Sequence, residues 1–494
     1  MIQPPTSPTL DGLFRRVLAR QPSAMALIDP ADKVRVTGQT PQRLTFAQAD
    51  RAVGALAAHF AAMGLPSNSV IAIQLANTSE FILTVLAAHR AGLVVALLPQ
   101  LWRQAELTVA LNRTGARAII TSRLIDGIDH ADLAMNAAAE AFAIRYVGGF
   151  GADLPDGMIS LDAVIAEGGG AMPAVAQDAR RAAIISFDVL DDGFRAVPRT
   201  HLNLIAGGLA IFLESGLPQG ATLMAALAPS SFAGLAATLV TWLLTGGALA
   251  LHHPFDADAL ESQLADNGCA VLIAPAMLAL KLADDELPSR LPALRHVIAL
   301  WRAPEQVTSS EAWTDRQTAL TDIYLFGEAG LFGACRGADG LPAPIMPGPH
   351  GAPRALSSSS IAGDVFLTPR GTLALRGPMI TPESYVPLLP VGQPALDHVD
   401  TGYTARIDRG TGAICITAPP AGLVAVGGYR FLSQDLTEWA KRLGQGALLT
   451  ALPDRLSGHR LAGRAQHNAR AREALSELGL NPLMVDAFRD RNAS

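Results

Sequence analysis

The 494-residue chain is poor in cysteine and in charged side chains. Its three cysteines, Cys269, Cys335 and Cys415, lie far apart, so their spacing indicates neither a disulfide framework nor a zinc site. Charged residues make up only 17% of the chain, and a net charge of −6 with a pI near 6.0 gives no basic surface for nucleic acid. Met1 to Asp11 lack the basic-then-apolar pattern of a signal peptide. We therefore expect a cytoplasmic protein with no metal site and no nucleic-acid partner.

Apolar residues are abundant, which raises the question of membrane insertion. Half of the residues are apolar, mean hydropathy is +0.27, and Glu214 is the only charged residue between Leu204 and His252. A membrane-spanning helix needs ~20 consecutive apolar residues. The longest uninterrupted run, residues 232–245, is shorter than that. A β–α–β unit that is covered on both sides explains this composition without a bilayer.

Strand and helix patterns alternate along most of the chain. The expected strands are 70–75, 93–98, 117–121, 221–227, 248–252, 270–273, 296–300 and 321–325. The expected helices are 79–91, 106–114, 201–214, 232–245, 256–267, 275–282 and a helix near 305–312. Such alternation is typical of an α/β fold with parallel or mixed sheets and flanking helices. The stretch 126–182 is less regular, and short strands beyond Gly333 predict a small β-rich subdomain over about 333–417.

One segment points to a known family of enzymes. Residues 182–204 read as a strand over 182–187, a loop, and a helix that begins near Thr200. In an α/β protein such an element normally holds a phosphate with backbone N–H groups and a helix N-terminus. Residues 197–204 (VPRTHLNL) closely resemble the segment after the phosphate loop of the AMP-forming, acyl-activating synthetases. That superfamily comprises fatty acyl-CoA ligases, aryl-CoA ligases, adenylation domains of peptide synthetases and luciferases.

The resemblance covers most of the chain, from about Leu44 to Leu461. The run from LTFAQAD (44–50) to ARAIITS (116–122) is similar to the N-terminal part of these synthetases, and VGGYRF (426–431) is similar to their GGENVYP segment. The resemblance implies a synthetase-like body over 1–417, with the β-rich subdomain at about 333–417, and a small α+β C-terminal lid over 418–494. Family lids run on to a lysine in a PxSGK-like motif, so we expect the lid to be reduced and truncated.

The position of the phosphate loop has different chemistry in this chain. The family loop, roughly TSGTTGxPKG, uses glycines that let backbone N–H groups approach phosphate oxygens. The corresponding residues include Asp188, Val189, Leu190, Asp191, Asp192, Gly193 and Arg195, the last in place of the lysine. A carboxylate here would repel phosphate by ~4 kcal/mol per pair of unit charges at ~4 Å and an effective dielectric near 20. We therefore expect a solvated surface turn that holds no phosphate.

The other nucleotide motifs of the family are altered too. Trp301 and Arg302 replace the two glycines of the adenine-side SGGAPL turn. In the segment similar to YGxTE (FGEAG, 326–330), the magnesium-binding Glu has become Gly330, and Glu328 lies two positions out of register. Tyr403 replaces the ribose-binding acid of the TGD motif. The chain has three lysines (Lys33, Lys281 and Lys441), and none lies in a C-terminal motif suited to catalysis.

This pattern of losses favours a protein that has lost adenylation and uses neither ATP, AMP nor Mg²⁺. The resemblance places an acyl or carboxylate pocket near Ser231, Phe232, Gly234, Trp301 and Phe326. Such a protein would bind an acyl group, acyl-CoA or an acyl carrier protein, or regulate an active synthetase as its partner.

Two alternatives remain open at the level of sequence. The first is a divergent ATP-dependent acyl-CoA or acyl-carrier ligase that uses Arg195 for phosphate and Glu328 for Mg²⁺. The second is hydrolysis or transfer of a preformed acyl thioester without a nucleotide. Ser186, Asp188 and His201 offer the residue types of a hydrolytic triad, but their spacing carries no geometry and no nucleophile elbow is visible.

Overall fold

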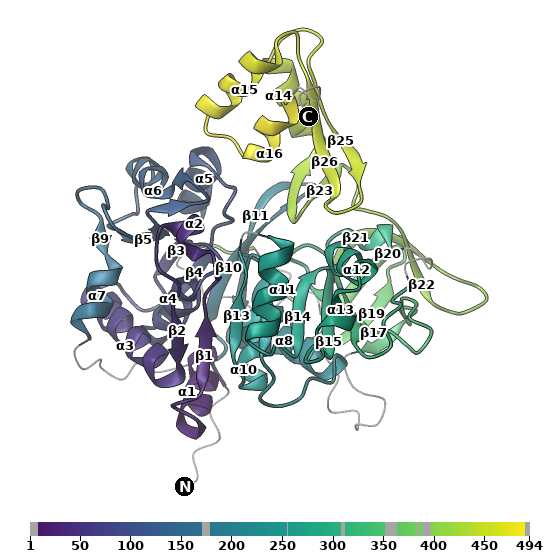
Figure 1. Cartoon of the computed structure of the whole chain (residues 1–494). Coiled ribbons are helices and arrows are strands. Elements are labelled where there is room, and N and C mark those ends of the chain that lie inside the picture. Colours follow the sequence, from purple (N-terminus) through teal and green to yellow (C-terminus); the bar gives the residue numbers. More distant parts are fainter. Residues whose placement is uncertain are drawn as a thin grey trace.

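The computed structural model describes residues 8–169, 178–253, 255–307, 312–350, 363–381, 384–387 and 397–489. Two large sheets with flanking helices form the body, and a small sheet with its own helices lies at the C-terminal end (Figure 1). The predicted α/β fold class is confirmed, because the large sheets are parallel or mixed and carry helices on their faces.

A seven-stranded sheet forms one half of the body. Its order is β11 (Gly193–Thr200), β10 (Ala182–Leu190), β4 (Val94–Leu97), β3 (Val70–Gln74), β5 (Ala118–Ser122), β8 (Tyr146–Phe150) and β9 (Ile159–Ser160). All neighbours are parallel except β11, which pairs antiparallel with β10 at the edge. Side chains alternate along the strands, so Ile71 and Ile73 enter one core while Val70 and Ala72 enter another.

Helices cover both faces of this sheet. They are α1 (Leu10–Arg20), α2 (Lys33–Thr37), α3 (Phe46–Ala62), α4 (Ser79–Arg90), α5 (Gln104–Thr114), α6 (His130–Ala139) and α7 (Leu161–Glu167). A capping box between Thr45 and Gln48 starts α3. Every residue of α4 is buried, because this helix packs in the core that joins the two large sheets.

An eight-stranded sheet forms the other half of the body. Its order is β17 (Leu331–Cys335), β16 (Ala319–Leu325), β15 (His296–Trp301), β14 (Val271–Pro275), β12 (Leu223–Ala225), β13 (Leu249–Leu251), β1 (Met25–Ile28) and β2 (Arg43–Thr45). The inner strands are parallel, and β17 and β2 are antiparallel at the edges. A two-stranded ribbon, β6 (Leu124–Ile125) and β7 (Ile128–Asp129), stands apart from it.

The helices of the second half are mostly those that the sequence predicts. They are α8 (His201–Glu214), α9 (Phe232–Leu235), η1 (Ala236–Val240), α10 (Thr241–Thr245), α11 (Ala257–Asp266), α12 (Ala276–Asp284) and α13 (Leu287–Arg290). The run 232–245 is one helical stretch with a π-helical turn at η1. Among the residues that the structure describes, no helix is long and apolar enough to cross a membrane.

Two antiparallel sheets complete the chain. One comprises β18 (Gly348–His350), β19 (Gly363–Leu367), β20 (Thr372–Arg376), β21 (His398–Ile407) and β22 (Ile414–Ala418). The other comprises β23 (Leu423–Val426), β24 (Tyr429–Leu432), β25 (Leu448–Asp454) and β26 (Gly458–Arg464), with α14 (Ser433–Arg442), α15 (Asn468–Glu477), α16 (Pro482–Val485) and η4 (Asp486–Phe488). We call residues 423–489 the C-terminal unit; it lies beyond the tip of the β10–β11 hairpin (Figure 1).

Three expectations about local structure are wrong. Residues 188–199 form the end of β10 and the partner strand β11 rather than a loop, because Leu190 pairs with Gly193 across a two-residue turn at Asp191 and Asp192. The irregular stretch 126–182 contains α6, β8 and α7, whose patterns are too short to detect. Near 305–312 the structure has only the short helix η2 (Pro304–Gln306), and residues 308–311 lie outside the described residues.

Candidate ligand-binding site

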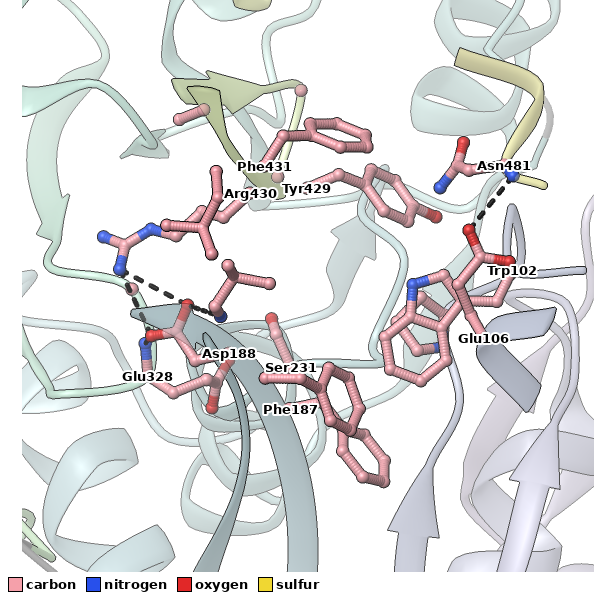
Figure 2. A pocket seen from close by; sticks show the side chains of 18 of the residues that line it. Trp102, Glu106, Phe187, Asp188, Ser231, Glu328, Tyr429, Arg430, Phe431 and Asn481 are labelled. Atoms are coloured by element: carbon pink, nitrogen blue, oxygen red, sulfur yellow. Dashed lines mark hydrogen bonds and ion pairs between the residues drawn. The ribbon is translucent and has the colours of Figure 1, made fainter. Parts of the chain in front are cut away.

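A cavity of about 470 Å³ lies where the body meets the C-terminal unit. Figure 2 shows that residues from the hairpin, from the start of α5 and from β24 surround it. Most of the side chains that line it are apolar, and they include Trp102, Val109, Phe187, Phe194, Phe431, Leu436, Trp439, Leu480 and Met484. The cavity therefore offers an apolar ligand a place between the two parts of the chain.

Three aromatic rings form one wall of the cavity. The Phe187 and Phe194 rings are 5.3 Å apart, and the Trp102 ring lies 5.2 Å from Phe187 and 5.6 Å from Phe194. Phe187 and Phe194 are diagonal neighbours on one face of the hairpin, because Val189 pairs with Phe194. The register of the β10–β11 hairpin therefore places both phenylalanine rings on the same wall of the cavity.

An ion pair joins the hairpin to the C-terminal unit. Arg430 Nη1 lies 3.2 Å from Asp188 Oδ2, and both side chains are largely buried, at 10% and 5% exposed. The same carboxylate accepts hydrogen bonds from the backbone N–H of Glu328 at 2.8 Å and of Val189 at 2.9 Å (Figure 2). Burial alone would lower the pKa of Arg430, but the neighbouring Asp188, Tyr403 and Glu328 together outweigh it and raise the pKa. The guanidinium thus remains charged.

The backbone at Gly327 lies directly against this ion pair. Its φ of +59° is unfavourable for other residues, and a Cβ there would lie 2.5 Å from Asp188 Oδ2 and overlap the Arg430 guanidinium. The second terminal nitrogen of Arg430, Nη2, donates a hydrogen bond to the hydroxyl of Tyr403 at 3.2 Å. Tyr403 is 1% exposed and its ring meets Phe326 edge-on at 5.5 Å. Arg430 is therefore surrounded by fixed groups of the body.

Glu328 is a buried carboxylate next to the ion pair. Its side chain accepts hydrogen bonds from the Ser186 hydroxyl and from the backbone N–H of Phe232, the latter at 3.2 Å. Burial raises the pKa of Glu328 to about 6, while the positive charge of Arg199 opposes the rise. Arg199 is fully buried, lies 3.7 Å from the Phe232 ring centroid, and donates to the backbone carbonyls of Glu328 and Met379. These contacts fix Glu328 in place.

The C-terminal unit contacts the body at further points around the cavity. The Tyr429 hydroxyl accepts a hydrogen bond from the backbone N–H of Leu101 at 3.1 Å. Glu106 Oε1 accepts from the N–H of Asn481 at 3.0 Å, and Glu106 Oε2 accepts from the N–H of Arg103 at 3.0 Å (Figure 2). Burial raises the pKa of Glu106. Specific polar contacts thus hold the C-terminal unit against the body around the cavity.

The structure gives no support for a metal site. Among the described residues, no group of three or more His, Cys, Asp or Glu side chains is placed to hold a metal ion. The neighbouring histidines at the end of β13 have protein partners instead. His252 hydrogen-bonds to Gln263 at 2.9 Å, and His253 pairs with Asp126 at 2.9 Å.

Comparisons with known proteins point to one superfamily. The family model described as AMP-binding enzyme matches residues 14–153. The chain is 26% identical over 269 residues to the medium-chain fatty-acid–CoA ligase of Escherichia coli K12, which is 53% of this chain and 47% of the ligase. It is 24% identical over 247 residues to the salicyl-AMP ligase / salicyl-S-ArCP synthetase of Mycobacterium tuberculosis, which is 50% of this chain and 42% of that enzyme. The matched segments thus span less than half of either relative.

The fold is shared over a longer span. The crystal structure of Brucella canis acyl-CoA synthetase covers 98% of this chain and 91% of its own, with a TM-score of 0.66 and 17% identity. The chain thus shares the fold of the AMP-forming, acyl-activating synthetases, and its residues 14–153 match their AMP-binding family model.

Residues at the synthetases' phosphate-loop position do not form one solvated turn here. Asp191 and Asp192 are at the exposed tip, and Arg195 pairs with Asp192 at 2.7 Å. Asp188, in contrast, is buried and bonded to Arg430. The expectation of a solvated turn is wrong for Asp188, because the sequence does not reveal that the C-terminal unit brings a cation to it.

The residues that the synthetase resemblance assigns to an acyl pocket are dispersed. Ser231 lines the cavity and caps α9 through the N–H of Gly234 at 3.1 Å. Phe232, Gly234, Trp301 and Phe326 are buried in the core and do not belong to the described lining. Trp301 in particular donates its indole N–H to Asp322 at 2.7 Å, so it is held in the sheet core.

The hydrolytic triad imagined from Ser186, Asp188 and His201 does not assemble. Ser186 donates to Glu328, Asp188 pairs with Arg430, and His201 accepts from the N–H of Leu10 and lies against His89. No lysine is among the described lining residues of the cavity. Of the residues that matter at this site, Arg430 lies inside the recognised VGGYRF motif, whereas Trp102 carries no sequence signal.

Proposed function

We propose that this protein is a non-adenylating member of the superfamily that binds an acyl or carboxylate compound in the cavity beside the C-terminal unit. One observation carries the proposal. Asp188, the segment of Glu328, and Tyr403 occupy three motif positions that contact the nucleotide in the family, and here they are linked to one another. The Arg430 side chain donates to Asp188 and Tyr403 at 3.2–3.3 Å, and the backbone N–H of Glu328 donates to Asp188 at 2.8 Å.

A nucleotide at these positions would have to displace the Arg430–Asp188 pair. Breaking a buried ion pair by removing one partner is strongly unfavourable, because the other charge stays buried without a partner. A phosphate beside Asp188 would also meet a carboxylate at close range. These costs support a protein that works without ATP, AMP or Mg²⁺.

The cavity supports the binding part of the proposal. Its volume of about 470 Å³ lies within the usual range for small-molecule sites, and its lining is apolar with a few polar groups. Relatives that carry names such as medium-chain fatty-acid–CoA ligase act on apolar acids, which suits the same type of ligand. A free acyl compound, an acyl-CoA or an acyl carrier protein could each supply the apolar acyl group that the cavity holds.

The competing ligase hypothesis finds less support. Its phosphate-binding cation, Arg195, is tied to Asp192 on the hairpin tip. Its metal ligand, Glu328, already accepts hydrogen bonds from Ser186 and Phe232. Neither side chain is poised for a nucleotide or its metal.

The decisive experiment is calorimetric titration of the purified protein with ATP in the presence of Mg²⁺, and then with AMP. We expect no binding heat and no rise in melting temperature with either nucleotide. Micromolar binding of either one would refute the non-adenylating assignment, and release of pyrophosphate with a carboxylic acid would then show the reaction.

A second experiment tests the cavity itself. The neutral fluorescent probe N-phenyl-1-naphthylamine should bind and be displaced by eight-carbon or naphthyl acyl compounds. A Val109→Trp variant, which replaces a small aliphatic side chain at the rim of the cavity with a bulky indole ring, should weaken the binding of both probe and competitor. Equal binding by wild type and variant would show that the ligand does not bind in this cavity.

A further inference from the structure

Arg302 differs from the other charged groups that line the cavity. It follows directly after β15, and its Nη1 donates to the backbone carbonyl of Gly427 in the turn before β24. Among the described residues, no carboxylate lies within ion-pair distance of it, and its Nε and Nη2 have no hydrogen-bond partner. Burial lowers the pKa of Arg302, and the neighbouring Tyr429 opposes that effect only in part.

Apart from the exposed Asp435, the other charged lining groups are already engaged. Arg430 is neutralised by Asp188, and Glu106 and Glu328 accept hydrogen bonds from backbone N–H groups and from Ser186. Asp435 lies in the first turn of α14 and is exposed. A half-buried guanidinium without a counter-ion is energetically unfavourable in the absence of a ligand. Arg302 is thus an unsatisfied positive group at an otherwise apolar cavity.

The orientation of Arg302 is fixed by its surroundings. Gly428 has a φ of +123°, and a Cβ there would lie 2.9 Å from Arg302 Cζ. The backbone of the β23–β24 turn therefore packs closely on the guanidinium, which only a glycine permits. With Nη1 held by Gly427, the edge formed by Nε and Nη2 is the one left for a ligand. Two parallel N–H groups on one edge match the two oxygens of a carboxylate.

We propose that Arg302 binds the carboxylate of a free apolar monocarboxylic acid whose hydrocarbon or aryl body lies in the cavity. The inference rests on the proposed function and narrows it, since it assigns the ligand as an acid rather than as a thioester or an ester. A phosphate or a CoA group is disfavoured, because Glu106, Glu328 and Asp435 also line the cavity and would repel a second negative charge.

The test compares ligands of equal shape and different charge. Displacement of N-phenyl-1-naphthylamine and calorimetry are measured with octanoate against octanamide, and with 2-naphthoate against 2-naphthamide. We expect each acid to bind roughly 10- to 100-fold more tightly than its amide, as one charge-assisted bidentate contact implies. Octyl phosphate should bind more weakly than octanoate.

Variants then assign the effect to Arg302. Arg302→Gln should abolish the preference for the acids while amide affinity stays unchanged, and Arg302→Lys should retain only part of the preference. Arg290→Gln removes one exposed arginine that pairs with Glu261 and serves as the control for net charge. Unchanged amide binding in Arg302→Gln also shows that the variant folds.

The outcomes separate this inference from the proposed function. Equal binding of acid and amide, or an acid preference that survives Arg302→Gln, would overturn the role of Arg302 and leave the apolar cavity site intact. Tighter binding of octyl phosphate than of octanoate would overturn the carboxylate assignment. Failure of every acid and amide to bind would overturn the proposed acyl site as well.

Discussion

The guanidinium of Arg430 in β24 lies 3.2 Å from the carboxylate of Asp188 in β10, across 242 residues of sequence. Asp188 stands where the synthetase family has a phosphate-loop residue, and Arg430 belongs to the first hairpin of the C-terminal unit. The pair therefore does two things at once. It supplies an internal partner where the family binds an external anion, and it ties the C-terminal unit to the body.

Neutralising Asp188 should destabilise the protein strongly. In Asp188→Asn the single amide oxygen can replace only one of the two acceptors, because Glu328 N–H donates to Oδ2 and Val189 N–H donates to Oδ1. The change therefore loses one of these hydrogen bonds and also leaves Arg430 buried without a counter-ion. We expect the free energy of unfolding from urea denaturation to fall by roughly 3–5 kcal/mol. Asp192→Asn breaks the exposed pair with Arg195 and should cost less than about 1 kcal/mol. If both variants lost the same free energy of unfolding, the buried ion pair would contribute no more to stability than the exposed one.

Glu328 should make stability depend on pH in a defined window. Burial raises its pKa to about 6 from the ordinary value of 4.5, so between these two values the folded protein binds more protons than the unfolded chain. Stability then falls as pH rises through this window, and it is unaffected by this group at lower pH. The total penalty above pH 6 is about 2 kcal/mol.

The comparison of wild type with Glu328→Gln isolates this contribution. Other titrating groups are common to both proteins, so the difference between their unfolding free energies should change by about 1.5 kcal/mol between pH 4.5 and pH 6.5, in favour of the variant at the higher pH. Urea denaturation at several pH values measures it. Two curves that stay parallel over this range would show that the Glu328 carboxyl is not perturbed.

Two helical glycines should respond in opposite ways to the same substitution. At Gly208 in α8 a Cβ would overlap the Val240 side chain and lie 3.0 Å from the carbonyl oxygen of Ala236, so Gly208→Ala should destabilise by about 1–3 kcal/mol. At Gly54 in α3 the nearest atom is a guanidinium nitrogen of Arg90 at 3.8 Å, so Gly54→Ala should stabilise by up to about 1 kcal/mol. Thermal denaturation of both variants tests the close packing of α8 on η1. A stabilised Gly208→Ala would show that this packing is looser than described.

Hydrophobic periodicity was sufficient to predict the body of the fold. The pattern of α8 gives its bounds, His201 to Glu214, because a capping box at Thr200 and an apolar face coincide there. The β10–β11 hairpin was missed, since Asp191 and Asp192 look like loop residues and the run Gly193 to Thr200 contains Pro198. An edge strand tolerates a proline, and β11 is the edge of its sheet.

The candidate site was only partly predictable from sequence. The altered motifs predict that nucleotide binding is lost, whereas contacts such as that between Asp188 and Arg430 become visible only when the C-terminal unit is placed against the body. Trp102 follows β4 of one large sheet and Arg302 follows β15 of the other, and both line the same cavity. Local sequence patterns do not reveal that these two segments lie together. The position of Trp301 is equally absent from local patterns, because its partner Asp322 lies on the neighbouring strand β16.

Glu106 should control how firmly the C-terminal unit is held. Its two carboxylate oxygens accept from the N–H groups of Arg103 and Asn481, which belong to the body and to the C-terminal unit respectively. Glu106→Ala removes both acceptors, so hydrogen exchange at these two amides should accelerate by roughly 10- to 100-fold. Glu140→Ala is the control, because Glu140 accepts only from the side chains of Gln104 and Thr108 and through its own carbonyl from Asn112.

Mass-spectrometric exchange on peptides that contain Arg103 and Asn481 gives the readout. Acceleration at Asn481 that spreads to β24 would show that docking at α16 and the Arg430–Asp188 contact open together. Acceleration confined to the two amides would show that the ion pair holds the unit by itself. Unchanged exchange at Asn481 would contradict a role for Glu106 in docking, because its N–H has no other acceptor among the described residues.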